Sequence, residues 1–313
     1  MQRRMFVAGM TAGAAALVGQ PAHSLAAPFG DADGPPAIDT HVHFFPPLAE
    51  KAGTHGAGQE RPPAQPGDWQ QAAHACGVRQ AVVIESSPDP EDNQRLLDLA
   101  GRHPEIVGVV GRLPIGAIDC PPLIRRFAAH RRFRGIRLRS DAILAGLDNA
   151  AFLQHMESLA DKGLAADVIG PTQLIAADRL AARLPQLRVM LEHMAGARIE
   201  GDKPDPRWLD GIAAASRHAN TWLKVSHVIQ SVDRDAEYPA LNRYAPWLEA
   251  VWDAFGDARV MFGTDWPVSL RHATYARIHD LVRQFVTGRG AEASRLFFAD
   301  NARRAYGLTD PER

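Results

Sequence analysis

The chain has 313 residues, of which 46% are hydrophobic and 23% charged, and its formal net charge is −1. This length and composition are typical of a globular protein with one large domain or two small ones. The near-neutral charge argues against a nucleic-acid surface, which normally needs a clustered excess of basic residues. Cys76 and Cys120 are too few for a disulfide framework, and we expect both to be free, inert thiols.

The first 27 residues differ in composition from the rest of the chain. Arg3-Arg4 precede a mildly apolar run rich in alanine and glycine at 8–19, and Ser24-Leu25-Ala26-Ala27 follows as a small-residue cleavage pattern. This order resembles a twin-arginine export signal, so we expect the twin-arginine export machinery to deliver the mature protein to the periplasm. A short N-terminal helix is the alternative. Beyond this segment, no stretch is apolar enough over about 20 residues to span a membrane.

After a leader at 28–36 that is rich in proline and glycine, β-branched runs alternate with amphipathic segments. The runs predict strands at 38–44, 80–85, 106–113, 135–139, 164–169, 189–193, 221–227 and 259–265. Alternating strands and helices favour a parallel sheet, and eight repeats predict an α/β fold, a closed (β/α)8 TIM barrel that forms one domain over 37–313. An open doubly wound sheet is the alternative, but no Gly-x-Gly-x-x-Gly turn follows the first strand.

The first predicted strand ends in two histidines, within the sequence Ala-Ile-Asp-Thr-His-Val-His at 37–43. Because side chains alternate faces along a strand, we expect Asp39, His41 and His43 on one side of the sheet. Two neighbouring imidazoles could hold one cation. A single His-x-His is a weak signal, however, and needs partners from other strands.

Active sites of such barrels lie at the carboxyl ends of the strands. The polar residues at the predicted strand ends are His41, His43, Glu85, Arg112, Arg137, Arg139, Asp167, Glu192, His193, Ser226, His227 and Asp265, with Trp266 next to the last of them. Histidines and carboxylates therefore converge on one rim. The long loop at 45–68 directly follows the first strand, and we interpret it as a lid over the substrate.

The last predicted strand places Asp265 where His41 and His43 would face it across the barrel mouth. Such an aspartate can bind a metal ion, act as a general base toward water, or cap the next helix.

Two arginines share a face of the fourth strand. Arg137 and Arg139 suit an anionic substrate through bidentate hydrogen bonds, unless one of them pairs with Asp141 or another acid of the rim. On the seventh strand, alternation leaves open whether Lys224 or His227 faces the interior. An inward lysine must be paired or deprotonated, and an inward His227 would be a substrate contact.

Several motifs together resemble the amidohydrolase superfamily, in particular its amidohydrolase-related branch with sugar lactonases, 2-pyrone-4,6-dicarboxylate lactonase and metal-dependent decarboxylases. The motifs are His-Val-His at 41–43, Leu-Glu-His-Met-Ala-Gly at 191–196, Leu-Lys-Val-Ser at 223–226 and Phe-Gly-Thr-Asp-Trp-Pro at 262–267, supported by Phe-Arg-Gly-Ile-Arg at 133–137 and Asp-Asn-Ala-Arg at 300–303. The resemblance covers nearly the whole predicted barrel.

The resemblance implies roles for individual residues. His41, His43 and Asp265 would form the metal-binding or water-activating core, with His193 as a fourth contributor and Asp265 as the general base. No histidine ends the fifth strand at 165–170, where several members have one, so we expect one divalent ion, zinc in the first place, or a metal-independent enzyme. Trp266, beside Asp265, is a further candidate substrate contact.

We therefore expect an exported hydrolase that opens a lactone of a small polar or acidic substrate, with the motifs nearer to those of sugar lactonases. The alternative is a metal-dependent, non-oxidative decarboxylase of the same superfamily, which would release carbon dioxide. A periplasmic solute-binding protein without catalysis is a third hypothesis, but such proteins usually have two lobes and do not need an aspartate aligned with two histidines.

Overall fold

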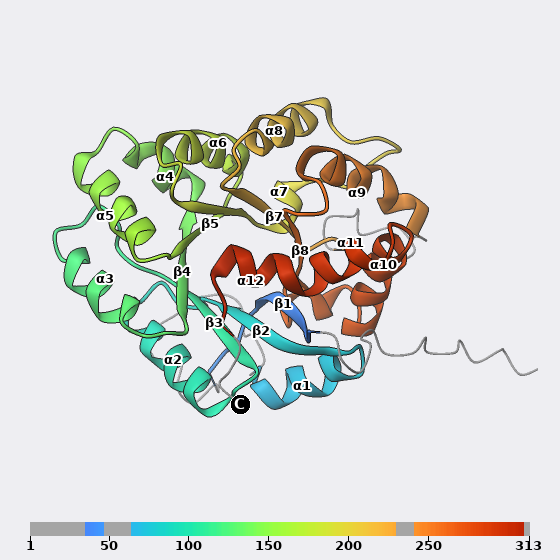
Figure 1. Ribbon diagram of the computed structural model, residues 1–313, viewed down its shortest axis with the longest axis horizontal. Helices are drawn as coiled ribbons and strands as arrows, with labels where there is room; N and C mark the ends of the chain where they lie inside the picture. Colours follow the sequence, from blue (N-terminus) through green and yellow to red (C-terminus); the bar gives the residue numbers. More distant parts are fainter. Residues whose placement is uncertain (1–34, 47–63, 230–240, 310–313) are drawn as a thin grey trace, which may run out of the picture.

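Eight parallel strands follow one another around a sheet in chain order, with helices between them (Figure 1). The computed structural model describes residues 35–46, 64–229 and 241–309. The strands are β1 Ala37–Val42, β2 Val78–Ile84, β3 Ile106–Gly111, β4 Phe133–Arg139, β5 Ala165–Ile169, β6 Arg188–Leu191, β7 Thr221–Val225 and β8 Val260–Phe262. The predicted (β/α)8 barrel is confirmed. The expected export signal, most of the leader and the middle of the loop at 45–68 lie outside the described residues.

The barrel closes between β1 and the segment that follows β8. The backbone N–H of Asp265 donates to the carbonyl oxygen of His41 at 2.9 Å, and the N–H of His43 donates to that of Trp266 at 2.8 Å. Val42 and Trp266 form a parallel bridge between the same segments. These contacts bring the first and last strand ends together, as the catalytic prediction requires.

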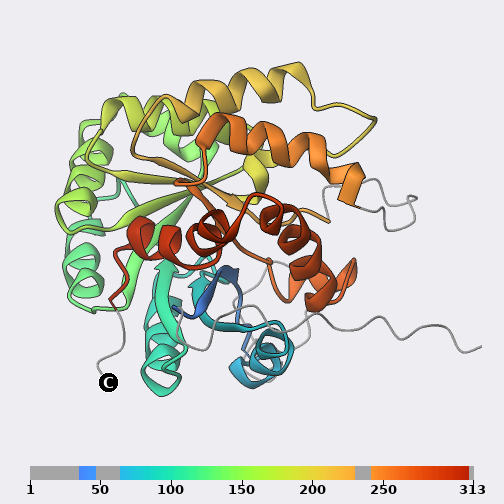
Figure 2. The ribbon, with the colours of Figure 1, turned by 45° about the vertical axis from the view of Figure 1, so that its right-hand side comes forward.

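Helices mostly surround the strands on the outside of the barrel (Figure 2), whereas the last helix lies across one end of it. They are α1 Pro66–His74, α2 Asp92–Arg102, α3 Cys120–Ala128, α4 Ser140–Gly146, α5 Ala150–Asp161, α6 Gln173–Arg183, α7 His193–Gly196, α8 Pro206–Ser216, α9 Leu241–Phe255, α10 Tyr275–Thr287, α11 Ala291–Arg295 and α12 Asn301–Tyr306, with the 3₁₀ helix η2 Val268–Arg271 and the π-helix η3 Leu296–Asp300. In α10, Ile278, Val282 and Phe285 recur at helical spacing and are buried, so one face of the helix packs on the core.

A second, smaller core fills the interior of the barrel. Ile38, Met190 and Met261 from three strands pack there with Tyr306 of α12. The helix α12 lies across the ring of strands (Figure 1), and its Arg303 donates a hydrogen bond to the side chain of Gln80 at 2.9 Å, near the start of β2. The C-terminal helix therefore closes the amino end of the barrel, opposite the end where the strand-end residues gather.

The side of the sheet that Asp39 faces differs from the prediction. Pairing between β1 and β2 changes register between Asp39 and Val42. Asp39 accepts hydrogen bonds from the backbone of Thr264 at 3.0 Å and from the hydroxyl of Tyr275 in the outer helix α10, also at 3.0 Å. The expectation that Asp39 shares a face with His41 is wrong, because this irregularity interrupts the alternation between them.

Both cysteines are free and buried, as expected. Burial raises the pKa of the Cys120 thiol to about 11, so this thiol stays protonated and unreactive at neutral pH. Within the described ranges, no helix combines the length and the apolar character needed to cross a membrane.

Candidate active site

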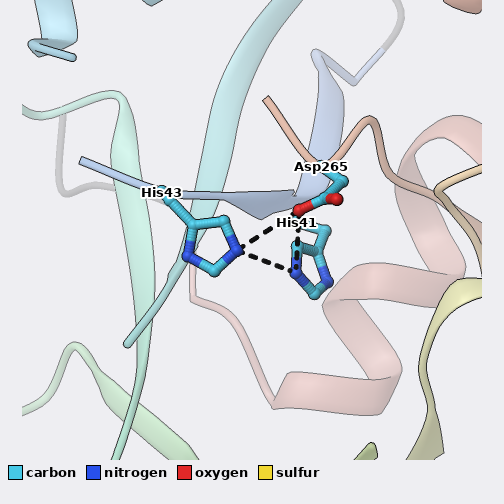
Figure 3. Close-up of side chains that lie close together, drawn as sticks. All are labelled: His41, His43 and Asp265. Atoms are coloured by element: carbon cyan, nitrogen blue, oxygen red, sulfur yellow. Dashed lines mark hydrogen bonds and ion pairs between the residues drawn. The ribbon is translucent and has the colours of Figure 1, made fainter. Parts of the chain in front are cut away.

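Three predicted site residues meet at the carboxyl end of the barrel (Figure 3). His41 Nε2 lies 3.2 Å from His43 Nε2 and 3.6 Å from Asp265 Oδ1, and His43 Nε2 lies 3.3 Å from the same oxygen. All three residues are buried, with exposed fractions of 0%, 5% and 3%. The structure thus brings together His41 of β1, His43 directly after β1 and the aspartate that follows β8.

The Nε2 atoms of the two histidines lie within hydrogen-bond distance of each other, at 3.2 Å. His43 Nδ1 lies 3.2 Å from the carbonyl oxygen of Ile84, which can only accept, so this nitrogen carries a proton. His41 Nδ1 lies 3.4 Å from a carboxylate oxygen of Glu192. Burial, followed by the charges of His193 and other neighbouring groups, lowers the pKa of His41 well below its ordinary value. His41 is therefore neutral at neutral pH.

A positive charge fits between these atoms. Two nitrogen lone pairs and a carboxylate oxygen repel one another unless a metal ion, or a proton on one of the two Nε2 atoms, lies among them. Around a tetrahedral zinc ion with bonds of about 2.0–2.1 Å, neighbouring ligand atoms are about 3.3 Å apart. The observed separations of 3.2, 3.3 and 3.6 Å are close to this value, so His41, His43 and Asp265 fit a divalent ion.

The two oxygens of the Asp265 carboxylate have different partners. Its Oδ1 faces the histidine pair, and its Oδ2 lies 2.8 Å from Nδ1 of His227. Burial alone would raise the pKa of Asp265, but hydrogen bonds with His227 and His43 and the charge of His193 hold it well below its usual range. Asp265 is therefore ionised at neutral pH.

His193 and His227 join the same cluster from the segments that follow β6 and β7. The ring of His193 lies 4.5 Å from that of His41 and 4.8 Å from that of His227, measured between centroids. Its Nδ1 is 3.0 Å from the hydroxyl of Ser226, and burial lowers the pKa of His193 to about 3. His193, His227 and Asp265 each have one nitrogen or oxygen atom within 4.8 Å of such an atom in the other two. These three residues therefore also offer ligand atoms for a metal ion.

The structure shows whether Lys224 or His227 faces the interior of the barrel, which alternation along the seventh strand left open. Lys224 points inward, is fully buried and pairs with Asp167 at 2.5 Å. His227 also reaches the site, because its backbone adopts a left-handed conformation with a φ of 58°. Left-handed backbone occurs at His193 and Asp265 as well, with φ values of 53° and 63°. Such conformations are uncommon outside glycine and often mark functional sites.

A pocket of about 370 Å³ opens above this cluster and has a charged wall. Its lining residues are His43, Glu85, Ser86, Ser87, Pro88, Arg112, Arg137, Ile169, His193, Asp265 and Val268. Arg137 donates two hydrogen bonds to Glu85 Oε1, at 2.9 and 2.7 Å, and Arg112 Nη1 lies 3.7 Å from the same oxygen. Burial alone would lower the pKa of Arg137, but Glu192 and Glu85 raise it above its ordinary value.

Two residues expected to contact the substrate lie elsewhere. Arg139 donates to Asp141 at 3.1 Å, its side chain is 56% exposed, and it does not line the pocket. Trp266 is buried and packs edge-on against Phe44, with ring centroids 6.0 Å apart. The backbone bridge of Trp266 to β1 holds its side chain in the outer core. Glu85 and Arg112, which do line the pocket, were predicted at strand ends without an assigned role.

Comparisons with known proteins agree with this geometry. A family model described as amidohydrolase matches residues 38–308. An L-fucono-1,5-lactonase from Burkholderia ambifaria is 30% identical over 244 residues, which cover 74% of this chain and 80% of the relative. A second L-fucono-1,5-lactonase, from Burkholderia multivorans, is 28% identical and covers 88% of this chain and 97% of its own. An amidohydrolase structure from Burkholderia multivorans with bound zinc is 27% identical, with a TM-score of 0.78 over 88% of this chain and 100% of that one. The chain belongs to the amidohydrolase family, as its motifs predicted.

Proposed function

We propose that this enzyme hydrolyses the ring ester of a neutral sugar lactone, with Asp265 as the general base. The observation that carries the proposal is the position of the Asp265 carboxylate. It lies at the floor of the pocket, with one oxygen toward His41 and His43 and the other toward His227. The similarity to two L-fucono-1,5-lactonases supports the reaction type.

His41, His43 and Asp265 would hold one divalent ion, with His193 as a further contributor. Imidazole and carboxylate ligands at this spacing suit zinc, and the zinc-bound relative supports that choice. Bound there, such an ion polarises the lactone carbonyl and lowers the pKa of water. In a metal-independent enzyme, imidazolium groups of the histidine cluster and the arginines of the pocket would stabilise the developing negative charge instead.

The residues of the chain would move one proton during hydrolysis. Ionised Asp265 accepts a proton from water while the water oxygen forms a bond to the lactone carbonyl carbon. The ring C–O bond then breaks, and protonated Asp265 returns the proton to the departing alkoxide. His227 holds the carboxylate in place through its contact with Oδ2 at 2.8 Å.

The charge of the pocket wall favours a neutral, hydroxylated substrate. One carboxylate, Glu85, compensates for both Arg137 and Arg112, and a second, Glu192, lies 3.6 Å from Arg137. A carboxylate-bearing substrate would be repelled by Glu85. The guanidinium groups, with Ser86 in the pocket lining, can instead hydrogen-bond to sugar hydroxyls.

The test is acid release from a panel of neutral aldonolactones and carboxylated lactones, measured before and after chelation. We expect turnover of neutral lactones and a loss of about 10²–10⁴-fold in Asp265→Asn, as is typical when a general base is removed. Asp141→Asn is the matched control, because Asp141 is 65% exposed, pairs with the rim residue Arg139 and does not line the pocket. Carbon dioxide release from carboxylated substrates, with no acid from any lactone, would establish the decarboxylase instead.

Turnover after chelation distinguishes the two forms of the mechanism. Activity that disappears with the chelator and returns with zinc requires the ion. Activity that survives chelation but not Asp265→Asn indicates a metal-independent lactonase. Ligand binding without turnover, unchanged in Asp265→Asn, would instead support a solute-binding protein.

Export to the periplasm is a separate part of the proposal. It rests on the sequence Arg3-Arg4, the apolar run at 8–19 and the small residues up to Ala27. Expression of the full chain, with fractionation and N-terminal sequencing of the product, tests it. We expect a periplasmic product that begins after Ala26 or Ala27, and a cytoplasmic, uncleaved product when both arginines are replaced by lysine.

A further inference from the structure

The two arginines of the pocket wall differ in how many of their donors are already used. Arg137 donates from Nε and Nη2 to Glu85 Oε1, at 2.9 and 2.7 Å, and its Nη1 lies 3.6 Å from Glu192. Arg112 Nη1 lies 3.7 Å from Glu85, which is too long for a hydrogen bond, and within the described residues its guanidinium donates none. The side chain of Arg112 is 38% exposed, against 16% for Arg137. The N–H groups of Arg112 are therefore available to a ligand in the pocket.

One buried side chain fixes the backbone of Arg112. Asn93, in the first turn of α2 and 1% exposed, accepts from the backbone N–H of Arg112 at 2.9 Å. Its Nδ2 donates to the carbonyl oxygen of Arg112 at 2.8 Å. Gly111 leaves room for this contact, because a Cβ at that position would clash with Asn93 Oδ1 and with the ring of Phe133. The amide thus satisfies both backbone groups of Arg112 and holds its Cα at one place on the rim.

Arg112 lies on the side of the barrel mouth away from the reacting atoms. It follows β3, whereas Asp265 follows β8 and its partner His227 follows β7. Four steps separate β3 from β7 in the eight-stranded order, so these two strands lie on opposite sides of the barrel. A lactone with its carbonyl carbon at Asp265 therefore extends its remote ring carbons across the pocket, toward Arg112.

We propose that Arg112 is a specificity-determining residue that binds ring hydroxyls of the lactone on the side remote from the carbonyl. A guanidinium presents several N–H donors in one plane and has no acceptor, so it can donate to the oxygen atoms of neighbouring hydroxyls. Arg137, held by two glutamates, is a fixed part of the wall. Asn93 is a positioning residue that acts through Arg112. The inference rests on the proposed function and adds which hydroxyls of the substrate are recognised.

The first experiment compares turnover of a hydroxylated δ-aldonolactone with that of δ-valerolactone, which has the same ring without hydroxyls. For Arg112→Met, we expect kcat/KM on the hydroxylated lactone to fall by about 10–100-fold, the range for hydrogen bonds to a charged group, mainly through KM. The value for δ-valerolactone should stay within about threefold of the wild type. Arg139→Met is the matched control and should change neither, because Arg139 pairs with Asp141 outside the pocket.

A third substrate tests which hydroxyls Arg112 contacts. A lactone that lacks only the hydroxyl next to the carbonyl should lose as much kcat/KM in Arg112→Met as the fully hydroxylated lactone does. A response like that of δ-valerolactone would overturn the placement of Arg112 on the remote side.

The role of Asn93 is tested in combination with Arg112. We expect Asn93→Ala to lower kcat/KM for the hydroxylated lactone more than for δ-valerolactone. In the double variant with Arg112→Met, it should cause no further loss of the preference for hydroxyls. A further loss there would contradict a role through Arg112. If Asn93→Ala does not fold, the Arg112→Met measurements still decide the proposal.

Ligand binding separates this inference from the proposed function. The probes are the lactam of the hydroxylated ring and δ-valerolactam, whose ring amides resist hydrolysis, with affinity measured by calorimetry. We expect the wild type to prefer the hydroxylated lactam, and Arg112→Met to lose about 10–100-fold of that preference. An unchanged preference in Arg112→Met overturns the inference, whether or not lactones are hydrolysed. Absence of turnover on every lactone, with the preference lost in Arg112→Met, would overturn the proposed function and leave this inference supported.

Discussion

Replacement of Glu85 by glutamine should shift the enzyme toward acidic lactones. Glu85 Oε1 accepts two hydrogen bonds from Arg137, at 2.7 and 2.9 Å, and lies 3.7 Å from Arg112. Glu85 therefore compensates for charge on both guanidinium groups of the pocket wall, and Glu192 is a further partner of Arg137 at 3.6 Å. Glutamine retains the size of the side chain and one acceptor oxygen, but without the negative charge. Both arginines then become available to a carboxylate of the substrate.

Coulomb's law gives the size of this effect. A substrate carboxylate that binds both arginines would lie about 6 Å from the Glu85 carboxylate, and two like charges at that distance repel by about 3 kcal/mol at an effective dielectric constant of about 20. That energy corresponds to a factor of about 100 in kcat/KM. We expect the kcat/KM ratio of an acidic lactone to its neutral counterpart to rise by about this factor in Glu85→Gln.

The assay compares acid release from two lactones of the same ring size, one with a carboxylate and one with a hydroxymethyl group at the same carbon. The matched control is Glu91→Gln, which removes a Glu–Arg pair with N–O distances of 2.8 and 2.9 Å on the protein surface. Its ratio should equal that of the wild type. A Glu85→Gln ratio within about threefold of the wild type would refute the electrostatic reasoning. Equal loss of both activities would show that Glu85 only supports the structure of the pocket.

Two further predictions concern stability. Burial lowers the pKa of His279 from 6.5 to about 4, so as the pH falls below 6.5 the unfolded chain binds this proton first and the folded state loses stability. The loss is about 3 kcal/mol by pH 4. Denaturant unfolding at pH 7 and pH 4.5 should show a smaller pH effect in His279→Phe, and an equal effect would contradict this. Gly135→Ala would place a Cβ 2.7 Å from the carbonyl oxygen of Ala165 on the next strand, and should cost about 1–3 kcal/mol. Gly101→Ala is the control, because Gly101 lies in the last turn of α2 and an added Cβ would meet nothing within 4 Å. It should leave stability equal or higher, and equal stability of both variants would count against the contact.

The fold could be predicted because each strand is a short β-branched run and the helices between them are amphipathic. The ends of the strands could not. The runs at 189–193, 221–227 and 259–265 were each predicted to continue to a site residue, whereas the strands end earlier, at Leu191, Val225 and Phe262. The residues beyond these ends leave the strand conformation, with left-handed backbone at His193, His227 and Asp265. Hydrophobic periodicity reports which side chains are buried, and carries no information on such local backbone turns.

The sequence also could not predict which acidic residue each arginine of the site pairs with. Arg137 and Arg139 are equivalent by alternation, yet one binds Glu85 in the pocket and the other binds Asp141 on the surface. The second pair is local in sequence, two residues apart, whereas the first joins residues on β4 and just after β2. Alternation along a strand predicts which face of the sheet a side chain lies on. Whether an arginine pairs with Glu85 in the pocket wall or with Asp141 on the surface depends on distances in the folded chain.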